Sequence, residues 1–318
     1  MIAPLHSPPM NDPQAVISRL KRAISSVYFG PEATIERVIV CLLARGHLLI
    51  EDVPGVGKTV LATTLARSVD CTFSRIQMTP DLLPSDVLGV SIFNRETGAF
   101  EFRPGPIFAN IVLADEVNRT SPRTQSALLE AMNDGSVSVD GVTHKLEQPF
   151  MIVATQNPFE FEGTFPLPEN QLDRFLMRVP LGYPSPEDEA RVLEQRPGVT
   201  ALPTLSPAIT RADLLGLQSL CDAVKVDGAI VRYIVAIANA TRQSAEFELG
   251  LSPRASLSLQ RTARAHALLS GREYVTPDDV LAHFEAVCAH RVLLKRGGLD
   301  SSAQQVGEAL QAILRSVP

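Results

Sequence analysis

Short apolar runs alternate with helix-like segments through the first half of the chain. Apolar runs bounded by glycine or proline are typical of buried strands, whereas the segments between them carry apolar residues at helical spacing. Near the N-terminus, for example, Val16, Leu20 and Ile24 recur at that spacing. The predicted strands are 48–50, 72–78, 108–115, 150–155 and 176–181, and the predicted helices are 13–27, 32–44, 60–69, 121–133 and 169–175. This alternation predicts an α/β domain with a parallel sheet.

Two predicted hairpins interrupt the alternation. In the first, residues 90–93 and 99–102 flank a turn at 94–98, and the second covers 136–146 with a turn at Asp140-Gly141. The first hairpin carries large apolar side chains at Ile92, Phe93, Phe100 and Phe102. Such an insertion either projects from the domain or packs its rings into the core, and the sequence leaves both possibilities open.

A cluster of prolines between 180 and 207 indicates a domain boundary. It surrounds a predicted helix at 185–196, which starts with a serine N-cap followed by proline. Beyond residue 209 the patterns are helical, with capping boxes at Thr210 and Thr276. The predicted units are a disordered tail at 1–13, an α/β domain at 14–185, a helix and linker at 186–209, and a helical domain at 210–318.

Two helices of the C-terminal region carry more specific predictions. Asp227 is expected to cap a helix whose apolar stripe includes Val231 and Val235. Arg254 falls in the first turn of another helix, where the helix dipole disfavours a cation. Arg254 is therefore expected to have an anionic partner, either a surface carboxylate or a nucleotide phosphate.

Composition narrows the class of protein. The 318 residues are 45% hydrophobic and 20% charged, which is typical of a globular chain with one large or two ordinary domains. A net charge of −6 gives no general attraction to nucleic acid or anionic lipid. The four cysteines lack the spacing of zinc ligands and favour buried free thiols. The most apolar run, 38–50, is too short and too interrupted for a membrane span. We expect a soluble, cytoplasmic protein without membrane insertion.

Residues 48–59 combine a predicted strand, a glycine-containing turn and the start of a helix. The turn matches the P-loop pattern G-x-x-x-x-G-K-[ST] at Gly57, Lys58 and Thr59, with Asp52 in place of the first glycine. In a P-loop, backbone N–H groups surround phosphates, the lysine contacts the β- and γ-phosphates, and the hydroxyl holds Mg²⁺. An ordinary strand–turn–helix corner is the alternative interpretation.

Two acidic residues, Asp115 and Glu116, end the apolar strand predicted at 108–115. One other predicted strand, 72–78, separates it from the P-loop segment. Beside a P-loop, Asp115 can hold Mg²⁺ and Glu116 can polarise an attacking water. Asn157, at the tip of the following strand, could orient that water. Alone, such an acidic pair is more often solvated or a helix cap, and an asparagine before proline is more often a turn residue.

In this order, the segments resemble the MoxR family of AAA+ ATPases over roughly 24–294 of the chain. The resemblance rests on Glu51-Asp-Val-Pro-Gly-Val-Gly-Lys-Thr59, Asp115-Glu-Val-Asn-Arg119, Thr124-Gln-Ser-Ala-Leu-Leu-Glu-Ala-Met132, Ala154-Thr-Gln-Asn-Pro158, Gly163-Thr-Phe-Pro-Leu-Pro-Glu-Asn-Gln-Leu-Asp-Arg-Phe175 and Leu251-Ser-Pro-Arg-Ala255. This sequence departs from the family pattern at two positions. Asp52 replaces the first P-loop glycine, and Asn170 stands where alanine is more usual. The resemblance implies a P-loop NTPase (AAA+) fold, with a parallel-sheet αβα domain followed by an all-α lid domain.

The resemblance also implies roles at matching positions, with ATP and Mg²⁺ as cofactors. The residues expected around the nucleotide are Pro54, Gly55, Val56, Gly57, Lys58, Thr59 and Val60. Thr59 and Asp115 would hold the metal, Glu116 and Lys58 would serve hydrolysis, and Asn157 would be the sensor-1 residue.

Further roles implied by the resemblance concern the arginines and the hairpins. Arg174 resembles the arginine finger offered to a neighbouring subunit, with Arg178 as a less favoured substitute, and Arg254 resembles sensor 2. The insertion at about 83–105 would be the helix-2 insert, and the hairpin at 136–147 the pre-sensor-1 hairpin. Both would point toward a central pore.

Members of such a family work as ring hexamers beside partners with a von Willebrand factor A domain, as chaperones in metal-centre insertion or complex assembly. The resemblance therefore implies a Mg²⁺-dependent ATPase that remodels a protein client. An ATP-gated scaffold with little hydrolysis is one alternative. A chelatase- or helicase-like motor is another, but only Arg95 and Lys145 stand out as basic residues in the hairpins, which disfavours nucleic acid.

Overall fold

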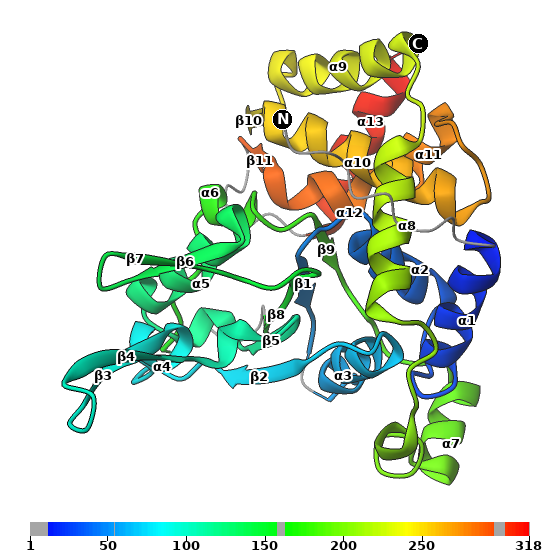
Figure 1. The fold of residues 1–318 in the computed structure, drawn as a ribbon. Coiled ribbons are helices and arrows are strands. Elements are labelled where there is room, and N and C mark those ends of the chain that lie inside the picture. The colour runs from blue at the N-terminus through cyan, green and yellow to red at the C-terminus, as the bar shows by residue number, and fades with distance from the viewer. Residues whose placement is uncertain (1–11, 54, 158–162, 296–302, 318) are drawn as a thin grey trace.

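A parallel sheet forms the centre of the first half of the chain. The computed structural model describes residues 12–53, 55–157, 163–295 and 303–317. The five strands run in the order β2-β5-β8-β1-β9, and each neighbouring pair is parallel (Figure 1). They are β1 (Leu48–Glu51), β2 (Phe73–Gln77), β5 (Ile111–Asp115), β8 (Met151–Gln156) and β9 (Met177–Val179). The five predicted strands are confirmed.

Both faces of this sheet are buried, because alternate residues of a strand point to opposite sides. In β1, Leu48 and Ile50 pack on one side and Leu49 on the other. The first side is covered by α1 (Pro13–Ser25), α2 (Glu32–Leu43) and α3 (Lys58–Ser68), and the second by α4 (Pro84–Leu88) and α5 (Pro122–Asp134). Burial on both faces explains why the strands read as continuous apolar runs.

The described chain begins at the cap of α1. Asp12 accepts hydrogen bonds from the backbone N–H groups of Gln14 and Ala15, and Pro13 is the first residue of the helix. The last two residues of the predicted tail are therefore the N-cap and the first residue of α1. Residues 1–11 of that tail lie outside the described residues.

Two antiparallel hairpins extend from the same side of the sheet domain (Figure 1). They consist of β3 (Gly89–Asn94) with β4 (Ala99–Pro104), and of β6 (Ser136–Val139) with β7 (Val142–Lys145). The Phe93 and Phe100 rings contact each other edge to face near the tip of the first hairpin, and Phe100 is 74% exposed. Phe102 instead stacks on His144 of the second hairpin. The first hairpin therefore projects, and only its base packs against the protein.

The C-terminal region is helical apart from one short strand pair. After α7 (Pro186–Gln195) and the 3-10 turn η3 (Leu202–Thr204) come α8 (Arg211–Ala223), α9 (Gly228–Gln243), α10 (Pro253–Leu269), α11 (Pro277–Leu281), α12 (Phe284–Cys288), the 3-10 turn η4 (Ala289–Arg291) and α13 (Ala303–Ser316). The prediction of exclusively helical structure misses the antiparallel strands β10 (Phe247–Leu249) and β11 (Leu293–Leu294). This region lies above the β9 edge of the sheet in Figure 1.

The predicted helix caps of this region are confirmed. Thr210 and Thr276 form capping boxes, and Asp227 accepts a hydrogen bond from the N–H of Ala229 at the start of α9. The apolar stripe of α9 is narrower than predicted. Val231 and Val235 are exposed, because each lies one residue, or about 100°, beyond the buried face.

The described ranges contain no helix with the length and apolarity needed to cross a membrane. The four cysteines are free thiols, and all but Cys71 are buried. Burial raises the pKa of the Cys41, Cys221 and Cys288 thiols to about 12.

His47, just before β1, is buried where β1, β8 and α5 meet. Its Nδ1 accepts a hydrogen bond from the N–H of Ile152 at 3.0 Å, so Nε2 carries the proton that is donated to the carbonyl of Met132 at 3.1 Å. The bond from Ile152 requires the neutral ring, because Nδ1 can accept a hydrogen bond only when it is unprotonated. Burial lowers the pKa of His47 to about 4.

We expect the free energy of unfolding to decrease as the pH falls from about 6.5 to about 4. In this window the unfolded chain binds a proton at His47 and the folded chain does not, so unfolding is favoured. The buried His283, whose pKa is also lowered to about 4 by burial, acts in the same direction. Urea denaturation near neutral pH and near pH 5 should show this loss of stability. The loss should be smaller in His47→Gln, and an equal loss in that variant would contradict the assignment.

Candidate functional site

The carboxyl ends of three strands meet at one edge of the sheet. β8 pairs in parallel with both β1 and β5, so the ends of all three lie side by side. At this edge Glu51 lies opposite Gln156, and Asp115 lies opposite Gln77 at the end of β2. The loop from β1 to α3 begins here. Open parallel sheets bind ligands at this end of their strands.

The loop before α3 has the backbone geometry of an anion site. Gly55 and Gly57 have φ angles of 89° and 90°, in the left-handed region that glycine adopts readily. Gly57 is the N-cap of α3 and provides no side-chain acceptor for the first N–H groups of the helix. These groups, at the positive end of the helix, are therefore available to an anion. Pro54, also predicted to line this site, lies outside the described residues.

Lys58, the first residue of α3, points across the loop toward the strand ends. Its Nζ donates to the carbonyl oxygen of Asp52 at 2.5 Å and lies 3.4 Å from that of Gln156. Partial burial lowers the pKa of Lys58, and the nearby carboxylates, including Asp115 and Glu116, oppose this shift. The ammonium group thus lies between the loop and β8, on the side of the acidic residues.

Asp52, which replaces the first P-loop glycine, has a structural role. Its Oδ2 accepts hydrogen bonds from the N–H groups of Leu181 and Gly182, at 2.8 and 2.6 Å. Its Oδ1 accepts from the N–H of Val53 at 2.7 Å. The carboxylate therefore ties the start of the loop to the segment after β9. A glycine could not form this link.

Asp115, at the end of β5, is held on both carboxylate oxygens. Oδ1 accepts a hydrogen bond from the hydroxyl of Thr155 in β8 at 2.6 Å, and Oδ2 pairs with Arg75 of β2 at 2.6 Å. The hydroxyl oxygen of Thr155 in turn accepts from the N–H of Glu116. Thr155 thus aligns the acidic pair with β8.

Glu116 follows β5 in the left-handed region, with φ 60°. This backbone conformation is uncommon outside glycine and turns the side chain away from the direction of the strand. Its Oε2 accepts a hydrogen bond from Gln77 at 3.0 Å and lies 3.3 Å from Nε of Arg119. Two side chains thus hold Glu116 near the sheet edge.

Asn157, the predicted sensor-1 residue, follows β8 directly. Its carbonyl oxygen lies 3.4 Å from the side-chain amide of Asn118, in the turn after Glu116. The two segments that carry the acidic pair and Asn157 are therefore adjacent, as predicted from the order of the strands.

The three predicted arginines are all engaged within the chain. Arg174 Nη1 donates to the carbonyl of Leu129 in α5 at 2.6 Å. Arg178 pairs with Glu51 at 3.0 Å. Arg254, in the first turn of α10, lies 3.7 Å from the carboxylate of Asp173. The sequence left a carboxylate or a phosphate open as the anionic partner of Arg254, and in the structure Arg254 pairs with a carboxylate.

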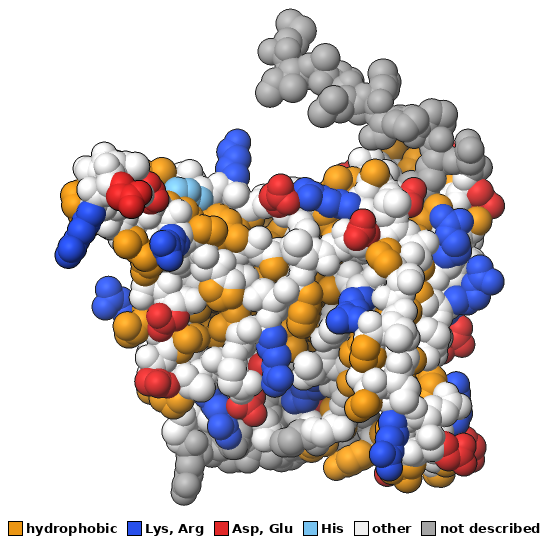
Figure 2. All heavy atoms as spheres, turned by 60° about the horizontal axis from the view of Figure 1, so that its bottom comes forward, with side chains coloured by type: hydrophobic (Ala, Val, Ile, Leu, Met, Phe, Trp, Pro, Cys, Tyr) orange, Lys and Arg blue, Asp and Glu red, His pale blue; other side chains and the backbone are white. Residues whose placement is uncertain are grey.

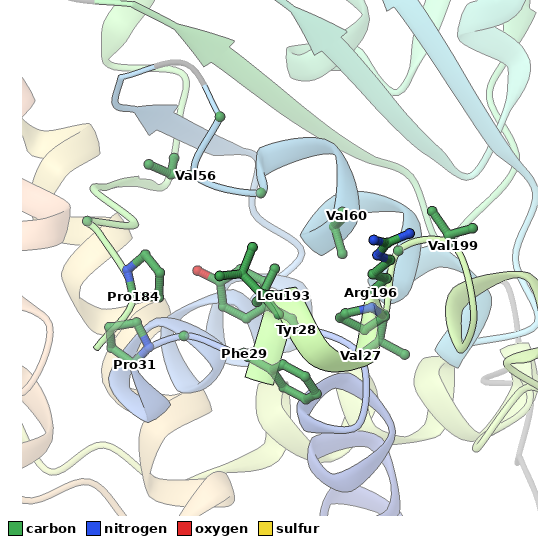
Figure 3. A pocket seen from close by; sticks show the side chains of 17 residues that line it. Val27, Tyr28, Phe29, Pro31, Val56, Val60, Pro184, Leu193, Arg196 and Val199 are labelled. Carbon is green, nitrogen blue, oxygen red and sulfur yellow. The ribbon is translucent and has the colours of Figure 1, made fainter. Parts of the chain in front are cut away.

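An apolar cavity of about 470 Å³ opens beside the glycine loop (Figure 3). Its walls come from residues 27–31 between α1 and α2, from residues 55–60, and from residues between 182 and 199 around α7. Figure 3 shows the Tyr28 and Leu193 side chains in the cavity, Val56 and Val60 above them, and the Arg196 guanidinium at one side. Burial, and secondarily the charge of Asp52, raises the pKa of Tyr28 to about 12.

The sequence patterns did not reveal this cavity or three side chains of the sheet edge, which are Arg75, Gln77 and Thr155. Residues 27–31 form an apolar run that ends in Gly-Pro where the first helix stops, and this was the available signal. Gln77 lies within the predicted strand 72–78, two residues after Arg75, so both could have been placed on one face of that strand. The role of Thr155 depends on the pairing of β5 with β8, which no local pattern reveals.

Comparison with known proteins agrees with this geometry. A model of the "ATPase family associated with various cellular activities (AAA)" matches residues 47–177, and an "AAA lid domain" model matches residues 239–315. The chain is 48% identical to a Bacillus subtilis (strain 168) protein named Uncharacterized protein YeaC, over 96% of this chain and 94% of that one.

It is 43% identical to Chaperone MoxR1 of Mycobacterium tuberculosis (strain H37Rv), over 92% of this chain and 81% of that protein. A crystal structure of a protein from Cytophaga hutchinsonii superimposes with a TM-score of 0.87 at 35% identity, covering 96% of this chain and 95% of the other. These matches cover almost the whole chain and include the glycine loop, the acidic strand end and the helical C-terminal region. The chain belongs to the MoxR family of AAA+ ATPases.

Proposed function

We propose that this chain is a Mg²⁺-dependent ATPase that acts in the cytoplasm as a ring of identical subunits and remodels a protein client. The observation that carries the proposal is the continuity of three features. The apolar cavity opens onto the glycine loop, and the loop faces the acidic edge of the sheet. A nucleoside fits a cavity of this size and polarity, with its phosphates directed along the loop.

The residues at the strand ends fit a magnesium ion. Thr59 offers a hydroxyl and Asp115 a carboxylate, which are oxygen donors of the kind Mg²⁺ prefers. A cation is already accommodated at Asp115, because the Arg75 guanidinium lies 2.6 Å from Oδ2. A magnesium ion held by Thr59 and Asp115 would supply positive charge against the negative charge that develops on the phosphates. Lys58 would add a second positive charge beside the β- and γ-phosphates.

Glu116 is the proposed general base. Its carboxylate lies at the edge where the terminal phosphate would end, beside the Asp115 metal ligand. To polarise a water it must leave Gln77 and Arg119, which hold it without nucleotide. Asn157, next to this segment, is proposed to orient the same water by a hydrogen bond. Positioning and charge placement supply most of the catalysis of phosphoryl transfer.

Arg174 is proposed to act on the nucleotide of a neighbouring subunit. In its own chain the Arg174 guanidinium donates to the carbonyl of Leu129 in α5. An arginine offered by a neighbour makes hydrolysis depend on assembly, which supports the choice of a ring over a monomer. Arg254 is proposed as the sensor of the phosphates from the lid.

The client side of the proposal rests on family membership and on the projecting hairpins. We propose that a von Willebrand factor A domain protein is the partner and that complex assembly or metal-centre maturation is the task. On the face seen in Figure 2, basic and acidic side chains are interspersed, which favours a protein client over nucleic acid. An ATP-gated scaffold is distinguished by the first experiment below.

Substitution of Glu116 by Gln should reduce ATP hydrolysis about 100-fold or more, the typical contribution of a general base. The amide keeps the size of the side chain, so the affinity for ATP should be unchanged. Phosphate release and titration with a fluorescent ATP analogue measure the two quantities. A wild-type chain that binds ATP without releasing phosphate would support the scaffold instead.

A substitution that fills the cavity should weaken binding of the nucleoside and leave binding of the phosphates unchanged. In Val60→Trp, the indole occupies space beside Val199, and the affinity for ATP should fall about 10-fold or more. Affinity for inorganic tripolyphosphate should change little, because the loop N–H groups remain. Val235→Trp, at an exposed position of α9, is the matched control. Calorimetry that shows equal ATP affinity in both variants would exclude the cavity as the nucleoside site.

Arg174→Ala should retain ATP binding and lose about 10³-fold in turnover, as expected for an arginine supplied by a neighbour. The wild-type rate per chain should rise steeply with protein concentration. Arg178→Ala is the matched comparison, since Arg178 pairs with Glu51 inside its own chain, and its effect on turnover should be much smaller. Concentration-independent turnover in the wild type would argue against a shared site.

A further inference from the structure

The segment Asp173 to Leu176 joins α6 (Glu169–Leu172) to β9 and includes Arg174. It lies where the sheet domain meets the lid, because η4 contacts α6 and α12 contacts β9 (Figure 1). The side chains that hold this segment come from the lid, although the segment itself belongs to the sheet domain.

Arg291, in η4, provides most of these contacts. Its Nε donates to the Asp173 carboxylate at 2.7 Å. Its Nη2 donates to the carbonyls of Asp173 and Phe175 at 3.2 and 2.6 Å, and its Nη1 donates to the carbonyl of Leu176 at 3.1 Å. The neighbouring His290 donates from Nε2 to the carbonyl of Phe175 at 3.0 Å. One guanidinium thus holds the backbone on both sides of Arg174.

Burial makes the Asp173 carboxylate essential to this arrangement. The Arg291 side chain is 1% exposed, and within the described part of the chain its carboxylate partner is Asp173. Burial lowers the pKa of Arg291, and the hydrogen bond and charge of Asp173 oppose that shift. A buried cation that loses its counter-ion is strongly destabilised, so the pair holds the segment against the lid.

The backbone contacts leave Arg174 on the other side of the segment. Because the carbonyls of Asp173, Phe175 and Leu176 are bound by the lid, the position of the Arg174 backbone is set by lid residues. Its guanidinium lies against α5, through the bond to Leu129. Arg174 therefore lies between the lid, which holds its backbone, and α5, which holds its side chain.

The second oxygen of Asp173 connects this clamp to the start of α10. Oδ2 accepts a hydrogen bond from the Ser252 hydroxyl at 3.3 Å and lies 3.7 Å from Arg254 Nη1. The Arg254 side chain is 54% exposed, so it can exchange this carboxylate for another anion. The same carboxylate thus contacts a fixed arginine and an exchangeable one, both from the lid.

We propose that Asp173 is a positioning residue: held by Arg291, it fixes the segment from which Arg174 reaches the nucleotide of the neighbouring subunit. The same carboxylate also lies 3.7 Å from Arg254, the proposed sensor of the phosphates. The inference rests on the proposed function, because it requires Arg174 to act between subunits.

The test begins with Asp173→Asn, which keeps the shape of the side chain and removes its charge. Affinity for a fluorescent ATP analogue should stay within about 2-fold of the wild type, whereas kcat should fall about 100-fold, as expected when a catalytic group is displaced by about 1 Å. Sedimentation velocity with ATP should show the wild-type assembly. An undiminished kcat would overturn the inference.

Mixed rings show on which subunit Asp173 acts. Asp173→Asn mixed with Glu116→Gln should regain activity, because the first supplies an intact Glu116 and the second an intact Arg174 segment. Asp173→Asn mixed with Arg174→Ala should stay inactive, because both variants lack the same element. Recovery in the second mixture would mean that Asp173 serves its own chain, and inactivity in both would mean a general defect. Either result would overturn the inference.

Asp279→Asn is the matched control for loss of a buried carboxylate–arginine pair in the lid. Asp279 is fully buried and accepts hydrogen bonds from Arg272 at 2.5 and 2.6 Å. This variant should lower Tm, because it leaves a buried arginine without its counter-ion. Its kcat should stay within about 2-fold of the wild type, because Asp279 does not hold the Arg174 segment. An equal loss of kcat would contradict a specific role for Asp173. Failure of the proposed function would look different, because the wild-type chain would then release no phosphate.

Discussion

The parallel pairing of β8 with both β5 and β1 is the constraint on which the candidate site depends. It places the glycine loop after β1, the acidic pair after β5 and Asn157 after β8 at one edge of the sheet. Those segments are far apart in the chain. Parallel strands leave their carboxyl ends on the same side, and so each crossover returns the chain to that edge. A loop that binds phosphate and an acid that binds metal can then face the same ligand.

Charges at this edge are balanced before any nucleotide binds. Asp115 pairs with Arg75, Glu116 with Arg119, and Glu51 with Arg178. Lys58 lies against backbone carbonyls, near the same carboxylates. Because an unpaired charge in a partly buried site is costly, this pairing lets the site exist without ligand. In the proposed function, a triphosphate with a metal ion would replace several of these pairs.

The lid and the sheet domain are joined by charge as well as by apolar packing. Arg291 is directed at carbonyl groups of the α6–β9 connection, and Asp173 neutralises it. Apolar contacts tolerate small sliding motions, whereas a guanidinium bonded to several acceptors fixes both distance and direction. The position of the Arg174 segment is therefore tied to that of Arg291 in the lid. The hairpin of β3 and β4, which carries Phe93 and Phe100, projects away from this junction (Figure 1).

The sequence by itself determined the five strands, both hairpins, the helix caps and the glycine loop, because these depend on local periodicity, turn residues and φ preferences. It did not reveal that Val231 and Val235 are exposed, that β10 and β11 pair, or that residues 27–31 form a cavity wall beside the loop. The partners of Asp52, Asp115 and Asp173 were likewise decided only by tertiary structure. Each of those carboxylates binds groups from strands or helices distant in the chain, and hydrogen bonds and ion pairs act over a few ångströms that local patterns do not encode.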